Sequence, residues 1–570
     1  MNRKQRRAGL KHTSSAGGAR SQSAAQLFAD ALRCQQENRL DEAARIYKRL
    51  LLLKPDHAEA SNNLAQVLQA QGKLAEASAS FARTLELMPQ LQSQFGAICR
   101  TLMSVLPVLE EAMRRANQAW PQRLSAERLF GSAGLAAVAA DPLLLTILRS
   151  SPVRDVALER VLTMLRAALL DAIVAGSARD DAALAFCCAL AQQCFINEHV
   201  FATTLAEDNQ VELIKTNLRD VPPMRLAALA MYVPLHALPD AQSLLDRTWP
   251  DDIEDVLTLQ LREPMEERAL RSSIPQLTAI EDVTSQRVRQ MYEENPYPRW
   301  VHIASNAALL PIDLYLRGMF PTAAFTPLAK TEGLDVLVAG CGTGWHAIGI
   351  AGVLQGARLL AIDLSLTSLA YAKRKTPPSL VIDYAQADIL KLGTIERRFD
   401  VIDASGVLHH MADPFAGWRT LLGLLRPNGL MHLGFYSELG RRDVVATRTF
   451  IAERGYGTSP AEIRRARQDL LATPLASVTR FDDFFSTSEC RDLLFHVQES
   501  RTTIPAIKAF LAEHGLKFIG FEFGDVALRG YRALFGERHW SMSDLDRWHE
   551  FETNYPDTFS GMYQFWVQKI

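Results

Sequence analysis

Three regularly spaced glycines mark the stretch of this sequence whose chemistry is easiest to interpret. Gly340, Gly342 and Gly344 follow an apolar run at 334–339 and precede a second apolar run at 346–351, an order that predicts strand, tight turn and helix. Glycine allows a positive φ and a close approach of the backbone to a ligand, and the first turn of a helix presents unpaired N–H groups there. The pattern therefore predicts a loop for a nucleotide-like ligand, although a purely structural strand-turn-helix connection has the same pattern.

Two carboxylates follow at positions that suit the same ligand. Asp363 ends the next apolar run, 358–362, and Asp388 comes one strand and helix later, after 380–382. Since the carboxyl ends of parallel strands meet at one edge of a sheet, both acids are expected beside the glycine loop. A carboxylate at the first position can accept from both hydroxyls of a ribose, and one at the second from an exocyclic amine.

Proton-accepting side chains come after the fourth and fifth apolar runs. His409 and His410 turn off the end of 399–404, and Tyr436 ends the run 430–436. With a reference pKa near about 6.5, histidine can act as a general base at neutral pH. The two histidines are the predicted bases and Tyr436 the lesser candidate. For both histidines the alternative is a structural hydrogen bond at the start of a helix.

The spacing of the glycines separates two classes of cofactor. A nicotinamide fingerprint places its third glycine five residues after the first, whereas here it comes after four and position 345 is Trp345. With Asp363, Asp388 and the turn at 406–411, residues 291–570 resemble the class I S-adenosylmethionine-dependent methyltransferases. The resemblance implies an α/β Rossmann-like, seven-stranded methyltransferase domain whose antiparallel last strand is 562–568.

The resemblance also assigns roles to individual residues. It places the methionine part of S-adenosyl-L-methionine on the glycine loop, the ribose at Asp363 and the adenine at Asp388. Val407 and its neighbours would flank the cofactor, and the segment before the first strand would cover the pocket as a roof. The expected cofactor-binding residues are Gly340, Cys341, Gly342, Thr343, Gly344, Asp363, Leu364, Asp388, Ile389, Ser405, Val407, Tyr292 and Tyr297. One departure is Val338, where the family usually has an acid that helps hold the amino group of the cofactor.

The expected reaction is an in-line displacement at the sulfonium methyl group, for which no metal is needed. The acceptor cannot be read from the sequence. Two other interpretations remain: a scaffold in which the methyltransferase fold has lost catalysis, which Val338 favours, and an oxidoreductase on the same sheet, which the glycine spacing disfavours.

The amino-terminal part repeats itself with a period of 34 residues. Asn38 matches Gly72, Tyr47 matches Phe81 and Pro55 matches Pro89. This period and these residue types resemble tetratricopeptide repeats, which implies a protein or peptide partner. The predicted division is a disordered basic tail at 1–20, two repeats at 21–91, a helical domain at 92–284, and the methyltransferase domain at 285–570 with a helical insertion at about 438–503.

Composition excludes several other classes of function. The 570 residues carry a net charge of −2 with 48% hydrophobic residues, so nothing global favours nucleic acid or an acidic membrane. The seven cysteines show no zinc-binding spacing. The basic amino terminus lacks the apolar stretch of a secretory signal, and the apolar run 135–140 is too short to span a membrane. We expect a cytoplasmic protein without a membrane partner, and nucleic-acid binding by the basic tail is disfavoured.

Overall fold

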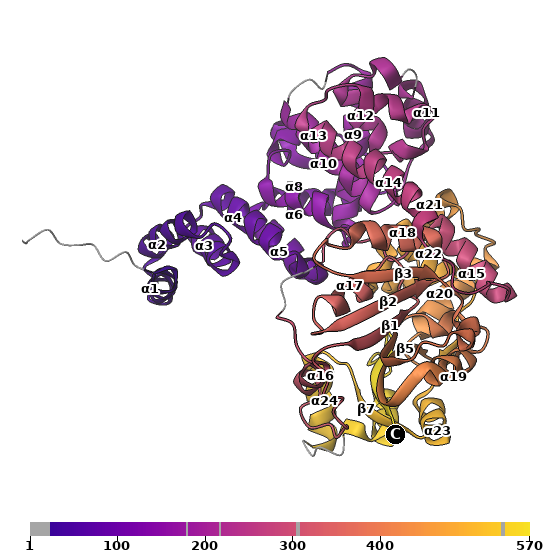
Figure 1. Cartoon of the computed structure of the whole chain (residues 1–570). Helices are drawn as coiled ribbons and strands as arrows, with labels where there is room; N and C mark the ends of the chain where they lie inside the picture. Colours follow the sequence, from indigo (N-terminus) through magenta and orange to yellow (C-terminus); the bar gives the residue numbers. More distant parts are fainter. Residues whose placement is uncertain (1–22, 178–180, 216–217, 304–307, 537–541) are drawn as a thin grey trace, which may run out of the picture. The chain divides into compact units, whose positions relative to one another are not determined.

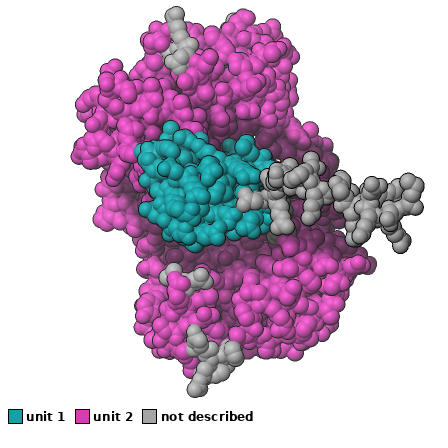
Figure 2. Space-filling model, turned by 90° about the vertical axis from the view of Figure 1, so that its left-hand side faces the viewer, with its two compact units in different colours: residues 1–88 teal, residues 89–570 magenta. Residues whose placement is uncertain are grey.

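The structure, a computed structural model, describes residues 23–177, 181–215, 218–303, 308–536 and 542–570. The predicted basic tail at 1–20 lies outside this part. The chain divides into two compact units, Met1–Met88 and Pro89–Ile570, which Figure 2 colours separately.

The first unit contains two helical hairpins, one for each predicted repeat. Its helices are α1 Ala24–Gln36, α2 Leu40–Leu53, α3 Ala58–Ala70 and α4 Leu74–Leu87. Asn38 and Gly72, which are 34 residues apart, both turn the chain between two helices with a positive φ, +57° and +73°. Tyr47 is fully buried and donates a hydrogen bond to Gln35 (2.9 Å). The repeated residues are therefore the turns and packing positions of the hairpins.

The second unit begins with a helical region, where the sequence predicts a helical domain. Its α-helices are α5 Phe95–Val105, α6 Val108–Ala119, α7 Ala126–Phe130, α8 Pro142–Ser150, α9 Val156–Val174, α10 Asp181–Ile196, α11 Leu205–Ile214, α12 Pro223–Ala230, α13 Asp251–Leu257 and α14 Glu263–Leu270. Among the described residues no single helix is long and apolar enough to cross a membrane, although the bent pair Ala126–Ala137 and Pro142–Ser150 meets the length and composition test together.

A twisted sheet follows, with strands in the order β3-β2-β1-β4-β5-β8-β7 (Figure 1). The strands are β1 Leu334–Ala339, β2 Ala357–Asp363, β3 Ile382–Gln386, β4 Phe399–Ala404, β5 Leu425–Ser437, β7 Leu516–Phe521 and β8 Tyr563–Lys569. Strands β1 to β5 are parallel, and β8 is antiparallel to both of its neighbours. The predicted fold class is confirmed, including the antiparallel last strand.

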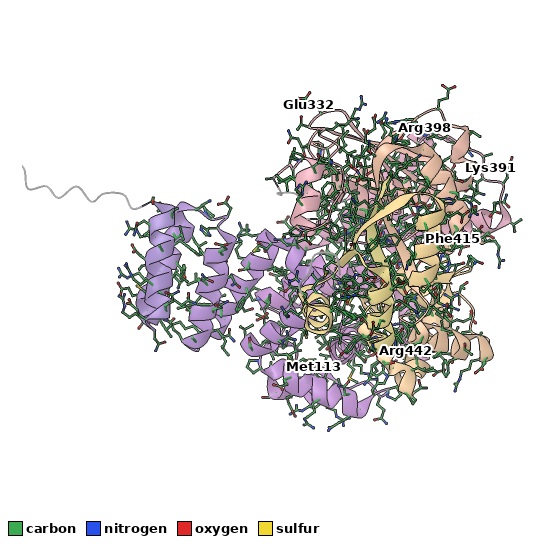
Figure 3. All side chains as sticks on the ribbon, turned by 90° about the horizontal axis from the view of Figure 1, so that it is seen from below. Met113, Glu332, Lys391, Arg398, Phe415 and Arg442 are labelled. Atoms are coloured by element: carbon green, nitrogen blue, oxygen red, sulfur yellow. The ribbon has the colours of Figure 1, made fainter. Side chains whose placement is uncertain are left out.

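Helices cover both faces of the sheet. One face packs on α16 Ile312–Met319, α17 Trp345–Ala351 and α18 Leu366–Lys375. The other face packs on α19 Pro414–Leu424, α23 Ile504–Glu513 and α25 Leu545–Asn554. Two further helices, α15 Val283–Glu294 and α24 Asp525–Phe535, precede α16 and α25 in the chain. On the second face Phe415 stacks on Phe510 with 5.3 Å between ring centroids (Phe415 is labelled in Figure 3). The continuous apolar runs of the sequence are thus strands buried on both sides.

The insertion between β5 and α23 packs against the helical region. It consists of α20 Arg442–Glu453, α21 Pro460–Leu471, α22 Thr487–Phe495 and the short strand β6 Arg501–Thr502, which pairs with the end of β5. Arg467 of α21 is fully buried and forms a bidentate ion pair with Glu159 of α9 (2.8 and 3.0 Å).

Residues just before the predicted boundary at 285 contact the sheet. The backbone N–H of Leu277 donates to the carbonyl of Gln386, and that of Gln386 donates to Pro275, each at 2.8 Å. These bonds extend the edge of the sheet at β3. The boundary at 285 stays a prediction, because Pro89–Ile570 forms one compact unit.

Candidate functional site

A cavity of about 220 Å³ lies where β1 to β4 end and the loops after them begin. Its walls include the glycine loop and the residues that follow the neighbouring strands. The sequence-predicted residues that line it are Tyr292, Tyr297, Gly340, Cys341, Gly342, Asp363, Leu364, Asp388, Ile389, Ser405, Val407 and His410. Thr343, Gly344, His409 and Tyr436 are not among its lining residues.

The glycine loop has the conformation that its sequence predicts. Gly340, Gly342 and Gly344 have φ values of +74°, +50° and +88°, in the region that side chains with a Cβ disfavour. A Cβ on Gly340 would lie 2.3 Å from Val407, and one on Gly342 would lie 2.6 Å from the carbonyl oxygen of Tyr297. The loop is therefore pressed between neighbouring segments, with no room for larger residues.

Asp363 fixes the glycine loop to the end of β2. One carboxylate oxygen accepts from the backbone N–H of Gly342 (2.8 Å), and the other from that of Ser365 (2.9 Å). Burial raises the pKa of Asp363, against the effect of these N–H groups. Each oxygen keeps a further lone pair, so the carboxylate can still accept from two hydroxyl groups of a ligand.

Asp388 has a carboxylate oxygen that is unused within the described part of the chain. Its Oδ1 accepts from the backbone N–H of Leu390 (2.9 Å), and its own N–H donates to Thr278 (2.8 Å). The other oxygen, Oδ2, is buried and has no hydrogen-bond partner there. A buried carboxylate oxygen without a hydrogen-bond donor destabilises the folded state. An amine of a ligand in the cavity would supply the missing donor.

The two predicted roof tyrosines line the cavity but direct their hydroxyls elsewhere. Tyr292 donates to Asp492 (2.6 Å) and Tyr297 donates to Asp483 (3.3 Å), both in the insertion. They attach the segment before β1 to the insertion. Thr343 is fully buried behind the loop, where its hydroxyl donates to the carbonyl of Pro298.

The three predicted bases differ in their access to the cavity. His409 is buried, its ring stacks on Tyr436 at 3.8 Å, and neither ring nitrogen has a partner in the described structure. Burial lowers the pKa of His409 far below its usual value and raises that of Tyr436. His410 lines the cavity, contacts the carbonyl of Gln498 through Nδ1 (3.1 Å), and has its pKa lowered by burial to about 4. His410 alone of the three can therefore contact a ligand there, as a neutral imidazole.

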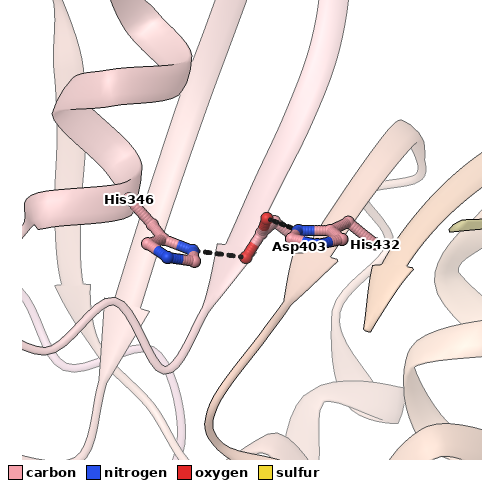
Figure 4. Close-up of side chains that lie close together, drawn as sticks. All are labelled: His346, Asp403 and His432. Carbon is pink, nitrogen blue, oxygen red and sulfur yellow. Dashed lines mark hydrogen bonds and ion pairs between the residues drawn. The ribbon is translucent and has the colours of Figure 1, made fainter. Parts of the chain in front are cut away.

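Sequence reasoning missed a second group of polar residues, His346, Asp403 and His432, which come from α17, β4 and β5 (Figure 4). Asp403 lies 2.6 Å from Nδ1 of His432 through Oδ2 and 3.5 Å from Nδ1 of His346 through Oδ1. His346 follows Gly344 by only two positions, and this spacing is a local signal that it lies near the glycine loop. No local pattern connects it to Asp403 and His432, since they meet only in the folded sheet.

These residues lie between the first cavity and a larger one of about 680 Å³. Trp345, His346, Asp403 and Gln564 line both cavities. The larger cavity extends over the sheet face to Trp566 and to residues of the helical region. The two cavities therefore share one wall.

The sequence of this region matches a known family. Residues 337–433, from β1 to β5, match the family described as methyltransferase domain. This part of the chain is a methyltransferase domain. Residues 35–99 match a tetratricopeptide repeat family, so both resemblances are confirmed.

Known relatives match only part of the chain. An uncharacterized protein of Synechococcus sp. is 27% identical over 282 residues, which cover 45% of this chain and 64% of the relative. A ubiquinone biosynthesis O-methyltransferase of Cereibacter sphaeroides is 36% identical over 101 residues, 18% of this chain and 40% of that protein. PKMT2 from Rickettsia typhi in complex with AdoHcy has a TM-score of 0.36 and 17% identity, covering 45% of this chain and 52% of that one. The chain thus spans less than two-thirds of these relatives.

The methyltransferase domain has the S-adenosylmethionine-binding fold that the sequence predicted. Its cavity fits that cofactor. The glycine loop would hold the methionine part, Asp363 the ribose, and the unpartnered oxygen of Asp388 the adenine amine. When bound, the cofactor supplies an electrophilic methyl group on a positively charged sulfur.

Proposed function

We propose that this protein transfers the methyl group of S-adenosylmethionine to an acceptor by in-line displacement. The observation that carries the proposal is one cavity that brings together the glycine loop, Asp363 and the unpartnered oxygen of Asp388. The chain contributes by holding donor and acceptor in line, which removes most of the entropic cost of their encounter.

The larger cavity is the proposed place for the acceptor. It shares Trp345, His346, Asp403 and Gln564 with the cofactor cavity, and its volume of about 680 Å³ is that of a site for a small molecule or a large side chain. Aromatic residues line much of it: Trp300, Tyr315, Trp345 and Trp566. A flat or aliphatic acceptor group would pack well on these rings.

We further propose that the acceptor, or the complex that carries it, is a protein recruited by the repeats. Tetratricopeptide repeats bind proteins in general, and residues 35–99 match this class. We also propose that the protein is cytoplasmic, as predicted from its sequence.

Calorimetric titration of the full chain with S-adenosylmethionine, S-adenosylhomocysteine and NADH tests the cofactor. We expect the first two to bind and NADH not to bind. Asp363→Ala should weaken S-adenosylmethionine binding by about 1.5 to 3 kcal/mol, the range for hydrogen bonds to a charged group. Asp383→Ala removes an exposed acid of β3 and should leave the affinity unchanged.

The alternative of a non-catalytic scaffold predicts a different result. A wild-type chain that binds neither S-adenosylmethionine nor its demethylated product would favour the scaffold. Transfer of labelled methyl groups into a cell extract, with labelled proteins separated from small molecules, would identify the class of acceptor.

A further inference from the structure

The cofactor of the proposed function carries an α-ammonium group that needs an anionic partner. The residue two positions before the first glycine is Val338, which is buried and apolar. In the parallel pair of β1 and β4, Val338 lies directly opposite Asp403. Paired residues on adjacent strands direct their side chains to the same face of the sheet. A carboxylate therefore lies one strand away from the position that lacks one.

The order of the strands places Asp403 at the methionine end of the cavity. Asp388 follows β3, Asp363 ends β2, the glycine loop follows β1, and Asp403 lies near the end of β4. Across the sheet, the expected contacts therefore run from adenine at Asp388 through ribose at Asp363 to methionine at the glycine loop, with Asp403 next to the loop. Asp403 also lines the cavity.

Asp403 has one strongly bound oxygen, Oδ2, and one whose contacts among the described residues are long, Oδ1. Oδ2 lies 2.6 Å from Nδ1 of His432, whereas Oδ1 accepts a long hydrogen bond from the backbone N–H of Ser405 (3.3 Å) and lies 3.5 Å from Nδ1 of His346, beyond the usual range for an N–H···O bond. Burial opposes ionisation of Asp403, but the neighbouring His432 and His346 outweigh this effect and lower its pKa. The group is thus a carboxylate at neutral pH, fixed by His432, and its Oδ1 keeps a further lone pair for a ligand.

We propose that Asp403 supplies, from the fourth strand, the carboxylate that binds the α-ammonium group of S-adenosylmethionine in place of the acid absent at Val338. His432 acts as a positioning residue, since its hydrogen bond fixes the carboxylate. The inference rests on the proposed cofactor.

Two ligands that differ in the amino-acid part test it by calorimetry on the full chain. S-adenosylhomocysteine carries the α-ammonium group, and 5′-methylthioadenosine lacks the whole amino-acid part. Asp403→Asn should weaken S-adenosylhomocysteine binding about 10- to 100-fold, as expected for a hydrogen bond between charged groups, and leave methylthioadenosine binding unchanged. Asp383→Asn, an exposed acid on β3, is the control.

Moving the acid back to β1 provides the second variant. Val338→Asp combined with Asp403→Asn should restore most of the lost affinity for S-adenosylhomocysteine, with the thermal midpoint recorded to verify folding. If the double variant does not fold, the different response of the two ligands to Asp403→Asn still decides.

Three outcomes separate the possibilities. Equal losses for both ligands would overturn the inference in favour of a purely structural Asp403. Unchanged affinity for S-adenosylhomocysteine would also overturn it, and slower methyl transfer with a shifted pH profile would then make the cluster a proton relay. A wild-type chain that binds neither ligand would contradict the proposed function itself.

Discussion

At the scale of single residues, the glycine loop leaves the least freedom for change. Gly342→Ala would add a Cβ 2.6 Å from the carbonyl oxygen of Tyr297 at a φ of +50°. Since the opposing atom belongs to the backbone, relief requires the loop to move. We expect cofactor affinity to fall at least about tenfold and the free energy of unfolding to fall by about 1 to 3 kcal/mol.

Gly349 in α17 is the matched control for this substitution. An added Cβ there meets nothing within 4 Å and its φ is helical, so Gly349→Ala should keep cofactor affinity and gain about 0.5 to 1 kcal/mol of stability. Titration calorimetry and urea unfolding of both variants give the comparison. Equal cofactor affinity in the two variants would show that the loop tolerates a Cβ.

The sequence predicted site residues that belong to a local motif. It did not predict those that come together only when distant strands pair. The glycines, Asp363 and Asp388 each follow directly from a strand end, and all of them except Gly344 line the cavity. His409 lies in the expected turn, but that turn is a short 3₁₀ segment that buries its ring against Tyr436. Asp403 was overlooked because its significance depends on the residue opposite it in β1.

At the scale of elements, the insertion carries three acids near the two roof tyrosines, of which Glu489 and Asp492 are buried and Asp483 is half-buried. Burial raises the pKa of Asp483 and Asp492 to about 6 each and that of Glu489 to about 8. Oε2 of Glu489 has no hydrogen-bond partner among the residues described. Glu489 therefore stays protonated in the folded state at pH values at which it would ionise in water.

This arrangement predicts that the contribution of Glu489 to stability falls as the pH rises. Unfolding exposes Glu489 to water, where its pKa is about 4.5, so between pH 4.5 and 8 the folded state keeps a proton that the unfolded state releases. The contribution of Glu489 to the free energy of unfolding should therefore decrease with pH across this interval. The buried histidines His409 and His410 contribute with the opposite sign below pH 6.5, so the decrease should be clearest above it. Glu489→Gln should remove much of that dependence and stabilise the protein at pH 8, at about 1.4 kcal/mol per pKa unit removed.

Urea unfolding at several pH values between 4.5 and 8.5 checks this expectation. Glu513→Gln, at an exposed position of α23, is the control and should leave the pH profile as it is in the wild type. A profile of Glu489→Gln that parallels the wild type would assign the pH dependence to other groups.

Most elements of the sheet could be predicted because their apolar runs have strand length. The edge contact beyond β3 could not be, since residues 275–277 carry no strand pattern and bond to Gln386 only through backbone groups. The pairing of β6 with β5 also escaped prediction, because two residues are too short to show a periodicity.

At the scale of the whole molecule, removal of residues 1–88 separates the two units. Every residue that lines the cofactor cavity lies in the second unit. We expect the fragment 89–570 to bind S-adenosylmethionine with wild-type affinity and to methylate a macromolecular acceptor more slowly. Calorimetry and methyl transfer into extract proteins, compared with the full chain, measure the two effects. Equal turnover of the natural acceptor would assign the repeats to localisation or assembly.

The ion pair between Arg467 and Glu159 restricts how this architecture can be recombined. A guanidinium without access to water needs its carboxylate, and removing one partner of such a pair costs about 3 to 5 kcal/mol. An insertion acquired without the helical region would leave Arg467 without its carboxylate partner and without the carbonyl of Val200, to which it also donates. The insertion and the helical region are expected to be inherited together, and homologues that lack one should lack the other.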